Sequence, residues 1–310
     1  MSTIEKALAK QKKAEELKKQ QSSLESTQNI DKREPGIEPT EQINEQMPAD
    51  TNVSDSHASA KTVSLKLDIL DEQGYVSLST NRKLINEELR AIKRKVLQNA
   101  FGGLSKTLKA ANLVTVTSTR PGEGKSFCAI NLALSIALEQ DKTVLLVDAD
   151  VLKPSVSSKL DIKHQVDAGL MEYLLDEVTD VTDIIYNTNI DNLRFIPAGR
   201  PNHLSTELLA SEKMAQLAQE FVTRYPDRIV VMDAPPLLGI NETAVLANLA
   251  GQVLVVVEEE KTHLSELKQA VEQIDKDKAV GFVMNKAKKQ SSTTGYGYGY
   301  AYAYASNTKN

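Results

Sequence analysis

The stretch that decides the fold is Thr117-Ser-Thr-Arg-Pro-Gly-Glu-Gly-Lys-Ser126. It follows a short apolar run, Leu113 to Thr117, that is typical of a buried strand, and it opens a helical pattern from Phe127 to Glu139. A strand, a glycine-containing loop, a Lys-Ser pair and a helix, in that order, form the context of a phosphate-binding loop. Such a loop turns backbone N–H groups inward, and the helix N-terminus adds the positive end of its dipole. The stretch therefore predicts a nucleotide site.

The residues of this loop have separate expected roles. Gly122 and Gly124 let the backbone approach the phosphates, Lys125 reaches the β- and γ-phosphates, and Ser126 ligates Mg²⁺. The expected nucleotide contacts in the loop are Pro121, Gly122, Glu123, Gly124, Lys125, Ser126 and Phe127. One departure is Thr119, which stands six residues before Lys125, where such loops usually have a glycine. The plainer alternative is a surface turn before a helix, but the flanking strand and helix favour nucleotide binding.

Carboxylates follow two further apolar runs. Thr143 to Val147 leads into Asp148-Ala-Asp150, and Arg228 to Met232 leads into Asp233. Continuous apolar runs suit strands covered on both faces, as in a parallel sheet. Residues at the carboxyl ends of such strands point into the crevice where ligands bind. We therefore expect Asp148, Asp150 and Asp233 to surround one Mg²⁺ beside the phosphates, although a single Asp after a strand is usually a cap or turn residue.

Alternating strands and helices continue to the end of the compact region. The expected strands are 193–197, 229–233, 252–257 and 279–284. The expected helices are 86–97, 168–175, 206–224, 242–249 and 262–275. This alternation predicts an α/β fold, a P-loop doubly wound parallel sheet flanked by helices. We place this domain at residues 80–288.

Composition limits the class of protein. The 310 residues are 41% hydrophobic and 25% charged, with a net charge of −5, as in ordinary soluble proteins. No apolar run is long enough to cross a bilayer, and the N-terminus has no signal peptide pattern. Cys128 is the one cysteine, which excludes a disulfide framework, favours a cytoplasmic protein and suits a small core residue. The charge predicts no nucleic-acid surface.

The N-terminal region has a different composition. Residues 1–25 have a basic, weakly amphipathic helical pattern, which indicates either a helix that touches a membrane or partner, or a marginal solvated helix. Residues 26–79 are expected to be a largely disordered linker, because 26–62 contain almost no large apolar residue. Within it, residues 63–79 are a candidate docking segment.

The C-terminal segment, residues 289–310, contains a cluster of tyrosines. Five of the nine tyrosines in the chain alternate with Gly or Ala: Tyr296, Tyr298, Tyr300, Tyr302 and Tyr304. The segment has too little aliphatic content to fold alone, so we expect a flexible tail. It is either an inert low-complexity tail, an edge strand with its tyrosines on one face, or a phosphoacceptor. The neighbouring phosphate-binding loop favours the phosphoacceptor.

One helix has a charged face. Glu87, Arg90, Lys93 and Arg94 are spaced by three or four residues in the helix expected at 86–97. This pattern fits either a solvated face or a contact with a neighbouring subunit close to its active site.

Together, the loop ending in Lys125-Ser126, the Asp148-Ala-Asp150 and Asp233 strand ends and the tyrosine cluster resemble the bacterial tyrosine kinases of polysaccharide export. Further stretches resemble more narrowly the tyrosine autokinases of exosortase-type exopolysaccharide loci: 1–8, 88–94, 193–199, 206–213 and 225–228. The resemblance covers about residues 80–304. It implies transfer of the ATP γ-phosphoryl group to tyrosine, mostly on the tail of a neighbouring subunit in a ring.

The resemblance also implies roles for single residues. Lys125 and Ser126 would hold ATP and Mg²⁺, Asp148, Asp150 and Asp233 would organise the metal, and Asp148 or Asp150 would accept the phenol proton. Asn285 would contact adenine, by likeness to the wider ATPase superfamily. Glu87, Arg90 and Lys93 match a Glu-x-x-Arg-x-x-Arg subunit contact, with Lys in the last position, where it lacks the bidentate fork of Arg. Leu152 replaces an Arg of the family, and Lys153 follows it.

The family further implies partners. Many relatives depend on a membrane-spanning chain-length regulator, which we expect here as a separate chain that holds this protein at the inner face of the plasma membrane. A cognate tyrosine phosphatase is a further expected partner. Two rival functions remain. One is a partitioning or septum-positioning ATPase, although those have Lys where this chain has Arg120, and the other is a non-catalytic ATP-binding scaffold of a polysaccharide machine.

Overall fold

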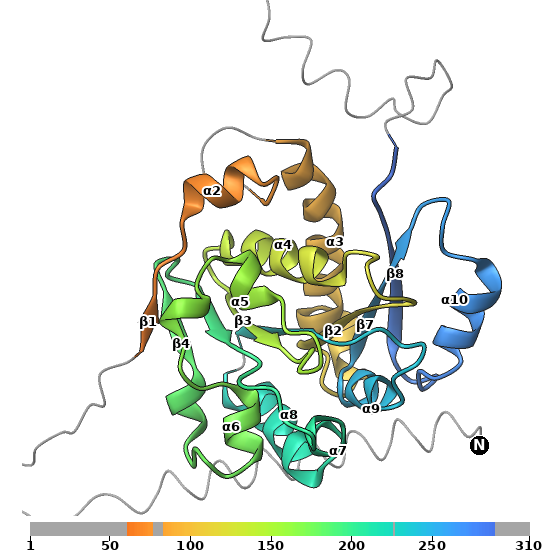
Figure 1. Ribbon diagram of the computed structural model, residues 1–310. Coiled ribbons are helices and arrows are strands. Elements are labelled where there is room, and N and C mark those ends of the chain that lie inside the picture. The colour runs from red at the N-terminus through yellow and green to blue at the C-terminus, as the bar shows by residue number, and fades with distance from the viewer. Residues whose placement is uncertain (1–60, 77–82, 226, 289–310) are drawn as a thin grey trace, which may run out of the picture. The chain divides into compact units, whose positions relative to one another are not determined.

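The computed structural model describes residues 61–76, 83–225 and 227–288. The predicted helix at 1–25, most of the predicted linker and the tyrosine tail lie outside these residues. Figure 1 shows a central sheet with helices on both faces. The strands are β1 (Thr62–Val63), β2 (Leu113–Ser118), β3 (Thr143–Asp148), β4 (Tyr186–Thr188), β5 (Leu193–Ile196), β6 (Arg228–Asp233), β7 (Gln252–Glu258) and β8 (Ala279–Asn285). The α-helices are α2 (Leu67–Glu72), α3 (Leu84–Phe101), α4 (Lys125–Ala137), α5 (Val156–Lys159), α6 (Leu170–Leu174), α7 (Ser205–Leu209), α8 (Glu212–Arg224), α9 (Glu242–Leu249) and α10 (Leu264–Val271).

The sheet confirms the predicted fold class. Its strand order is β1-β4-β5-β3-β6-β2-β7-β8, and every neighbouring pair is parallel except β4 with β5. The strand before the phosphate loop, β2, therefore lies between β6 and β7, and β3 lies beyond β6. This order brings Asp148 and Asp233, which are partners in register at the ends of β3 and β6, to the edge of the sheet where the loop begins.

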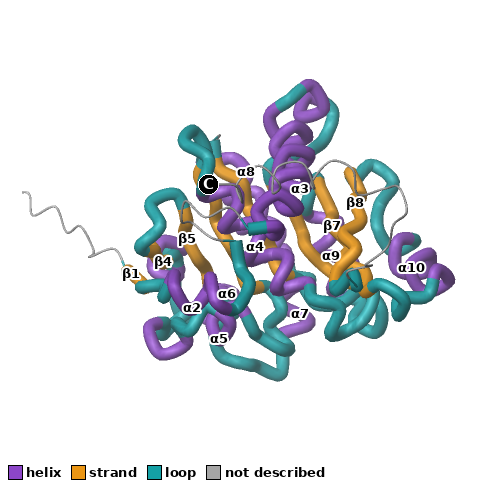
Figure 2. The backbone as a smooth tube through the Cα atoms, turned by 90° about the horizontal axis from the view of Figure 1, so that it is seen from above, coloured by secondary structure: helices purple, strands orange, loops and turns teal. Residues whose placement is uncertain are grey.

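Two apolar layers hold the sheet. Alternate residues of β2 point to opposite faces: Val114 and Val116 pack with α3 and α4, whereas Leu113 packs with α8 and α9. Figure 2 shows the helices along the strands from above. Because β2, β3 and β6 are buried on both faces, they appear in the sequence as continuous apolar runs, as parallel strands do. The core strands therefore hold the ligand-binding edge rigidly.

The predicted linker at 26–79 extends too far. Residues 61–76 belong to the compact structure, because β1 pairs with β4 and because Val63, Leu65, Leu70, Tyr75 and Val76 are buried in the α4 layer. Val76 donates its backbone N–H to Asn131 Oδ1 of α4 at 2.7 Å. The candidate docking segment thus docks on its own domain, and the domain begins about twenty residues before the predicted boundary.

Some predicted elements differ from the structure. The helix expected at 206–224 is two helices, α7 and α8, because Ser211 caps α8 by accepting the backbone N–H of Met214 at 3.2 Å. Strands β1 and β4 were not predicted. Helix α3 is longer than expected and α10 is shorter.

Candidate active site

The phosphate-binding loop lies between β2 and α4, as predicted. Gly122 and Gly124 have φ values of 89° and 100°, a region that side chains with a Cβ rarely adopt. A Cβ on Gly124 would also lie 2.0 Å from Asn285 Nδ2. Both glycines are therefore required by the backbone of the loop, and α4 begins directly after them at Lys125.

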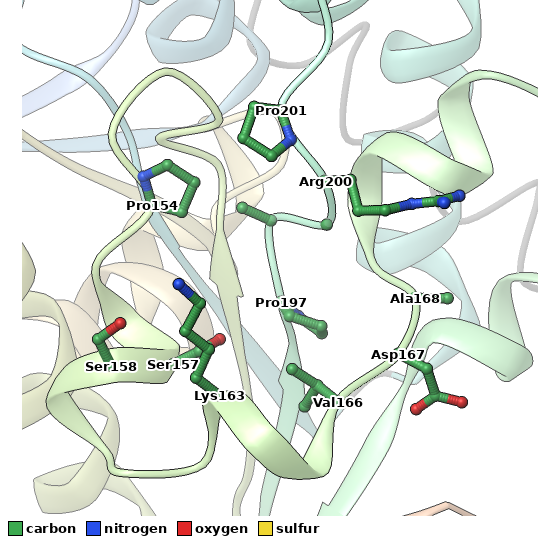
Figure 3. A pocket seen from close by; sticks show the side chains of 12 residues that line it. Pro154, Ser157, Ser158, Lys163, Val166, Asp167, Ala168, Pro197, Arg200 and Pro201 are labelled. Atoms are coloured by element: carbon green, nitrogen blue, oxygen red, sulfur yellow. The ribbon is translucent and has the colours of Figure 1, made fainter.

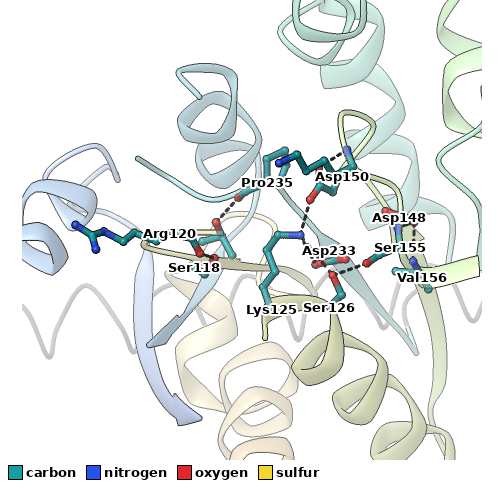
Figure 4. Close-up of polar contacts among 12 residues, drawn as sticks. Ser118, Arg120, Lys125, Ser126, Asp148, Asp150, Ser155, Val156, Asp233 and Pro235 are labelled. Carbon is teal, nitrogen blue, oxygen red and sulfur yellow. Dashed lines mark hydrogen bonds and ion pairs between the residues drawn. The ribbon is translucent and has the colours of Figure 1, made fainter. Parts of the chain in front are cut away.

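Lys125 is the centre of the polar network. Its Nζ lies 2.6 Å from Asp150 Oδ2, 3.5 Å from Asp233 Oδ1 and 3.4 Å from Ser126 Oγ (Figure 4). Burial alone would lower the pKa of Lys125, but Asp233 and Asp150 outweigh burial and raise it. Lys125 is therefore a cation that the carboxylates hold in place before any phosphate arrives.

The carboxylates differ in how they are held. Asp148 Oδ2 accepts the backbone N–H groups of Ser155 and Val156 at 3.2 and 3.1 Å, and Asp150 Oδ1 accepts that of Lys153 at 3.1 Å. Burial and the nearby Asp233 raise the pKa of Asp148 well above its ordinary value. Burial also raises the pKa of Asp233 to about 6, although Lys125 opposes that rise.

Buried oxygen atoms at this site lack partners. Among the described residues, Asp148 Oδ1 and both carboxylate oxygens of Asp233 are buried without a hydrogen bond. No group of three or more acidic, histidine or cysteine side chains in the described part of the chain is arranged to hold a metal ion by itself. Mg²⁺ usually takes one or two carboxylates, with substrate phosphates and water completing its shell. The unpartnered oxygens of Asp148 and Asp233 therefore fit a magnesium ion that is shared with a nucleotide, and the predicted participation of all three carboxylates stays a prediction.

A cavity of about 360 Å³ opens beside the loop. Its walls include most of the predicted loop contacts together with Asp150: Pro121, Gly122, Gly124, Lys125, Ser126 and Phe127. They also include residues that the sequence analysis did not single out: Ser155, Lys159, Pro236 and Ile240. Ser155 Oγ lies 2.9 Å from Ser126 Oγ, so Ser155 reaches the predicted magnesium ligand. In the sequence, only the position of Ser155 between Asp150 and the next helix could have indicated that it belongs to the site.

Two predicted nucleotide contacts do not line this cavity. Glu123 is 4% exposed, and its side chain accepts hydrogen bonds from the backbone of Arg120, at 2.8 Å, and from Thr262 Oγ1. Asn285 Nδ2 donates to the backbone oxygen of Glu123 at 2.8 Å. In the structure Glu123 therefore stabilises the loop through its own side chain, and Asn285 stabilises it by binding the loop backbone. An adenine contact for Asn285 stays a prediction.

A second cavity, of about 290 Å³, is lined in part by Ser157 and Ser158 of α5 (Figure 3). It is also lined by the segment between α5 and α6, which includes Lys163, and by the loop after β5, which includes Arg200. Arg200 is held by Glu172, with Nε 3.0 Å from Oε1, and by Glu177. The cavity has no glycine loop and none of the predicted site residues, so the nucleotide site is assigned to the first cavity.

Helix α3 carries the predicted subunit contact. Arg90 NH1 lies 3.0 Å from Glu87 Oε2 on the exposed face of the helix. Lys93 is engaged within its own chain, because its Nζ donates to the backbone oxygen of Ser135 at 3.1 Å and lies 2.5 Å from Glu139 Oε1. The three residues thus do not form one free surface, and the subunit contact stays a prediction.

Glycine loop, helix dipole, lysine and carboxylates together define a P-loop nucleotide-binding protein. A family model described as an AAA domain matches residues 111–286. The tyrosine-protein kinase YwqD of Bacillus subtilis is 31% identical over 227 residues, which are 73% of this chain and 90% of that one. The putative tyrosine-protein kinase EpsB of Ralstonia nicotianae is 35% identical over 163 residues, which are 53% of this chain and 21% of that longer one.

The solved kinase domain of VpsO has a TM-score of 0.56 and 26% identity, over 66% of this chain and 96% of that one. The chain belongs to the bacterial tyrosine-protein kinase family. The predicted recognition and enzyme class are confirmed. The narrower likeness to exosortase-locus autokinases stays a prediction.

Proposed function

We propose that this protein is an ATP-dependent autokinase that phosphorylates Tyr296, Tyr298, Tyr300, Tyr302 and Tyr304 on a neighbouring subunit of an oligomer. The observation that carries the proposal is the Lys125–Asp150 pair in the cavity beside the loop. The pair supports the proposal because the ammonium expected to bind phosphate lies 2.6 Å from the carboxylate that we assign as the proton acceptor. Lys125 begins α4, and Asp150 follows the buried strand β3.

ATP binding and proton transfer are linked through this pair. When the β- and γ-phosphates arrive, Lys125 exchanges Asp150 for phosphate oxygens, since both compete for the same ammonium group. Asp150 stays held by the Lys153 N–H and becomes free to accept a proton. A bound Mg²⁺, held by Ser126 with Asp148 or Asp233, would neutralise the developing phosphate charge.

In the transfer step, one bond forms at the γ-phosphorus while another breaks. The phenol oxygen of the acceptor tyrosine forms a bond to the γ-phosphorus, the bond from that phosphorus to the bridging oxygen breaks, and ADP leaves. The phenol proton passes to Asp150. A tyrosine hydroxyl is neutral at pH 7 because its pKa is about 10, so positioning contributes more than its intrinsic nucleophilicity.

The resemblance supports a cellular role. We propose that phosphorylation regulates the polymerisation and export of an exopolysaccharide. A separate membrane-spanning chain-length regulator would hold the kinase at the inner face of the plasma membrane, and a tyrosine phosphatase would reverse the reaction. Within the described residues, no helix has the length and apolar character to cross a membrane.

The test is mass spectrometry of the C-terminal peptide after incubation with ATP and Mg²⁺, using the full chain and Lys125→Met, with and without the membrane partner. Lys106→Met is the matched control, because Lys106 is exposed and does not line this cavity. We expect several phosphates on Tyr296–Tyr304 with the parent chain and none with Lys125→Met. Steady ATP hydrolysis with no phosphate, even with the partner, would overturn the kinase function and support a positioning ATPase.

A further inference from the structure

Strand β8 forms a long open edge of the sheet. The strand at the other edge, β1, has two residues, whereas β8 has seven, and among the described residues it pairs only with β7. Its sequence, Ala-Val-Gly-Phe-Val-Met-Asn, contains no charged residue and no proline. Charges, prolines and short length are the usual protection of exposed edges against pairing. The edge of β8 has none of them, so it is suited to accept another strand.

A groove of about 350 Å³ runs between α3 and this edge. Most of its walls are apolar: Ile92 and Val96 come from α3, and Leu254 and Val283 come from β7 and β8. Lys95, Asn99 and Gln252 add polar groups to the lining. Gly281 contributes no side chain, and a Cβ there would lie 2.9 Å from Leu254 Cδ2. Leu254 therefore already covers Gly281, so a ring from an added strand would lie against Leu254 in the groove rather than on the glycine itself.

One buried acceptor beside the groove has no hydrogen-bond partner in the described part of the chain. Asn99 is 9% exposed and lines the groove, and its Oδ1 has no partner among the described residues. Its Nδ2 donates to Gln252 Oε1 at 3.0 Å, while Gln252 Nε2 donates to two backbone oxygens, which fixes the orientation of both amides. An acceptor buried without a partner is costly. Because this oxygen is enclosed, the groove offers an incoming tyrosine an apolar surface for its ring rather than a hydrogen-bond acceptor for its hydroxyl.

The tyrosine tail of the same chain is the occupant that best fits. The last described residue, Lys288, lies three positions beyond the end of β8. Ten residues, 286–295, separate β8 from Tyr296, enough for the chain to turn back, and the segment Tyr296–Tyr304 has nine residues against seven in β8. Because successive side chains of a strand alternate, this segment would place all its tyrosines on one face and Gly or Ala on the other.

We propose that Tyr296–Tyr304 adds to the edge of β8 as an antiparallel strand, with one tyrosine ring in the α3–β8 groove. Backbone bonds supply the affinity and the groove supplies the side-chain specificity, as in other cases of strand addition. The short connection keeps the effective concentration of the segment high. This resting site for the tail goes beyond the proposed kinase function and does not depend on phosphoryl transfer.

Amide hydrogen exchange of the full-length protein, without nucleotide, tests the proposal. We expect residues 279–285 and 296–304 to exchange about tenfold or more slowly than in a full-length variant with all five tail tyrosines replaced by Ser. Because no ATP is present, failure here leaves the kinase function untouched. Unprotected exchange of 296–304 in the parent chain would overturn the proposal.

Two single substitutions locate the site. Gly281→Leu fills the groove, and we expect it to remove the protection of 296–304 while circular dichroism shows an intact fold. Met284→Ala is the matched control, since Met284 is 64% exposed and aligns with Val257, on the sheet face opposite the groove. Equal protection in Gly281→Leu and the parent chain would contradict the groove. Protection that appears only with rising protein concentration, together with a larger sedimenting species, would assign the edge to a second copy and overturn the proposal.

Discussion

At the scale of single residues, the site has one lysine among three carboxylates. Asp148 and Asp150 are each held by backbone N–H groups, whereas Asp233 is fully buried, accepts no backbone N–H of the described residues, and lies near the Lys125 ammonium, at 3.5 Å, and the Ser126 side chain. Burying a charge with so few partners destabilises the fold. Asp233 is therefore the site carboxylate whose burial costs the fold most stability, although it is predicted to bind Mg²⁺.

Asp233→Asn is expected to stabilise the nucleotide-free protein. An aspartate in an unfolded chain ionises near pH 3.9, whereas in the fold the pKa of Asp233 is about 6. Between these values the folded state binds more protons, so stability falls as pH rises through this window, and the cost is fully present above pH 6. Asp233→Asn removes that cost, by at most about 3 kcal/mol at pH 8 and by nothing near pH 4.

Thermal unfolding between pH 4 and pH 8 measures this difference. Asp183→Asn, which replaces an exposed aspartate, is the control and is expected to follow the parent curve. Parallel curves for Asp233→Asn and the parent chain would show that Asp233 carries no such cost.

At the scale of elements, the end of β8 supports the phosphate loop. Asn285 donates to the backbone oxygen of Glu123, and Lys286 Nζ donates to that of Gly122 at 2.7 Å and to Glu258 Oε2 at 2.9 Å. The loop is thus held from behind by residues far from it in sequence. Its shape depends on β8 as much as on its own glycines.

Lys286→Met is expected to weaken ATP binding about threefold to tenfold. The substitution removes a charge-assisted hydrogen bond to the loop, whose net value of about 1 kcal/mol corresponds to roughly fivefold in affinity. Titration calorimetry with ATP and Mg²⁺ measures the effect. Lys288→Met removes the same charge two residues on, where the side chain pairs with Glu260 and not with the loop, and should change affinity by less than about twofold. Equal effects of both substitutions would exclude the loop contact as the cause.

Comparing elements shows what the sequence could predict. Buried strands such as β2 and β6 and the loop that ends in Lys125 were predicted because each has a strong local pattern. Strand β4 has three residues with a polar centre, and β1 has two, so both depend on pairing with each other rather than on local preference. The supporting roles of Glu123 and Asn285 were missed for the same reason, since their partners lie up to 162 positions away.

At the scale of the whole molecule, two residues of the predicted subunit contact on α3, Arg90 and Lys93, have different roles. Arg90 has a half-exposed side chain that is paired only along its own helix, whereas the Lys93 side chain is 12% exposed and bridges α3 to α4. One residue is therefore available to a neighbouring subunit, and the other fastens a helix to its own domain.

Arg90→Ala and Lys93→Ala are expected to have different effects. Arg90→Ala should reduce the size of the oligomer in sedimentation velocity without changing thermal stability. Lys93→Ala should lower stability by about 1 kcal/mol, because it removes a largely buried hydrogen bond and ion pair, and should leave the oligomer intact below the melting temperature. Loss of the oligomer in Lys93→Ala alone would contradict this division.

The contact between Lys286 and the phosphate loop also has a mechanical consequence. The chain leaves the sheet at Lys286, which donates to the backbone oxygen of Gly122. A force on the C-terminal segment would therefore act on that hydrogen bond before it acted on the core strands. The shape of the phosphate loop is thus coupled to the position of the residue that follows β8.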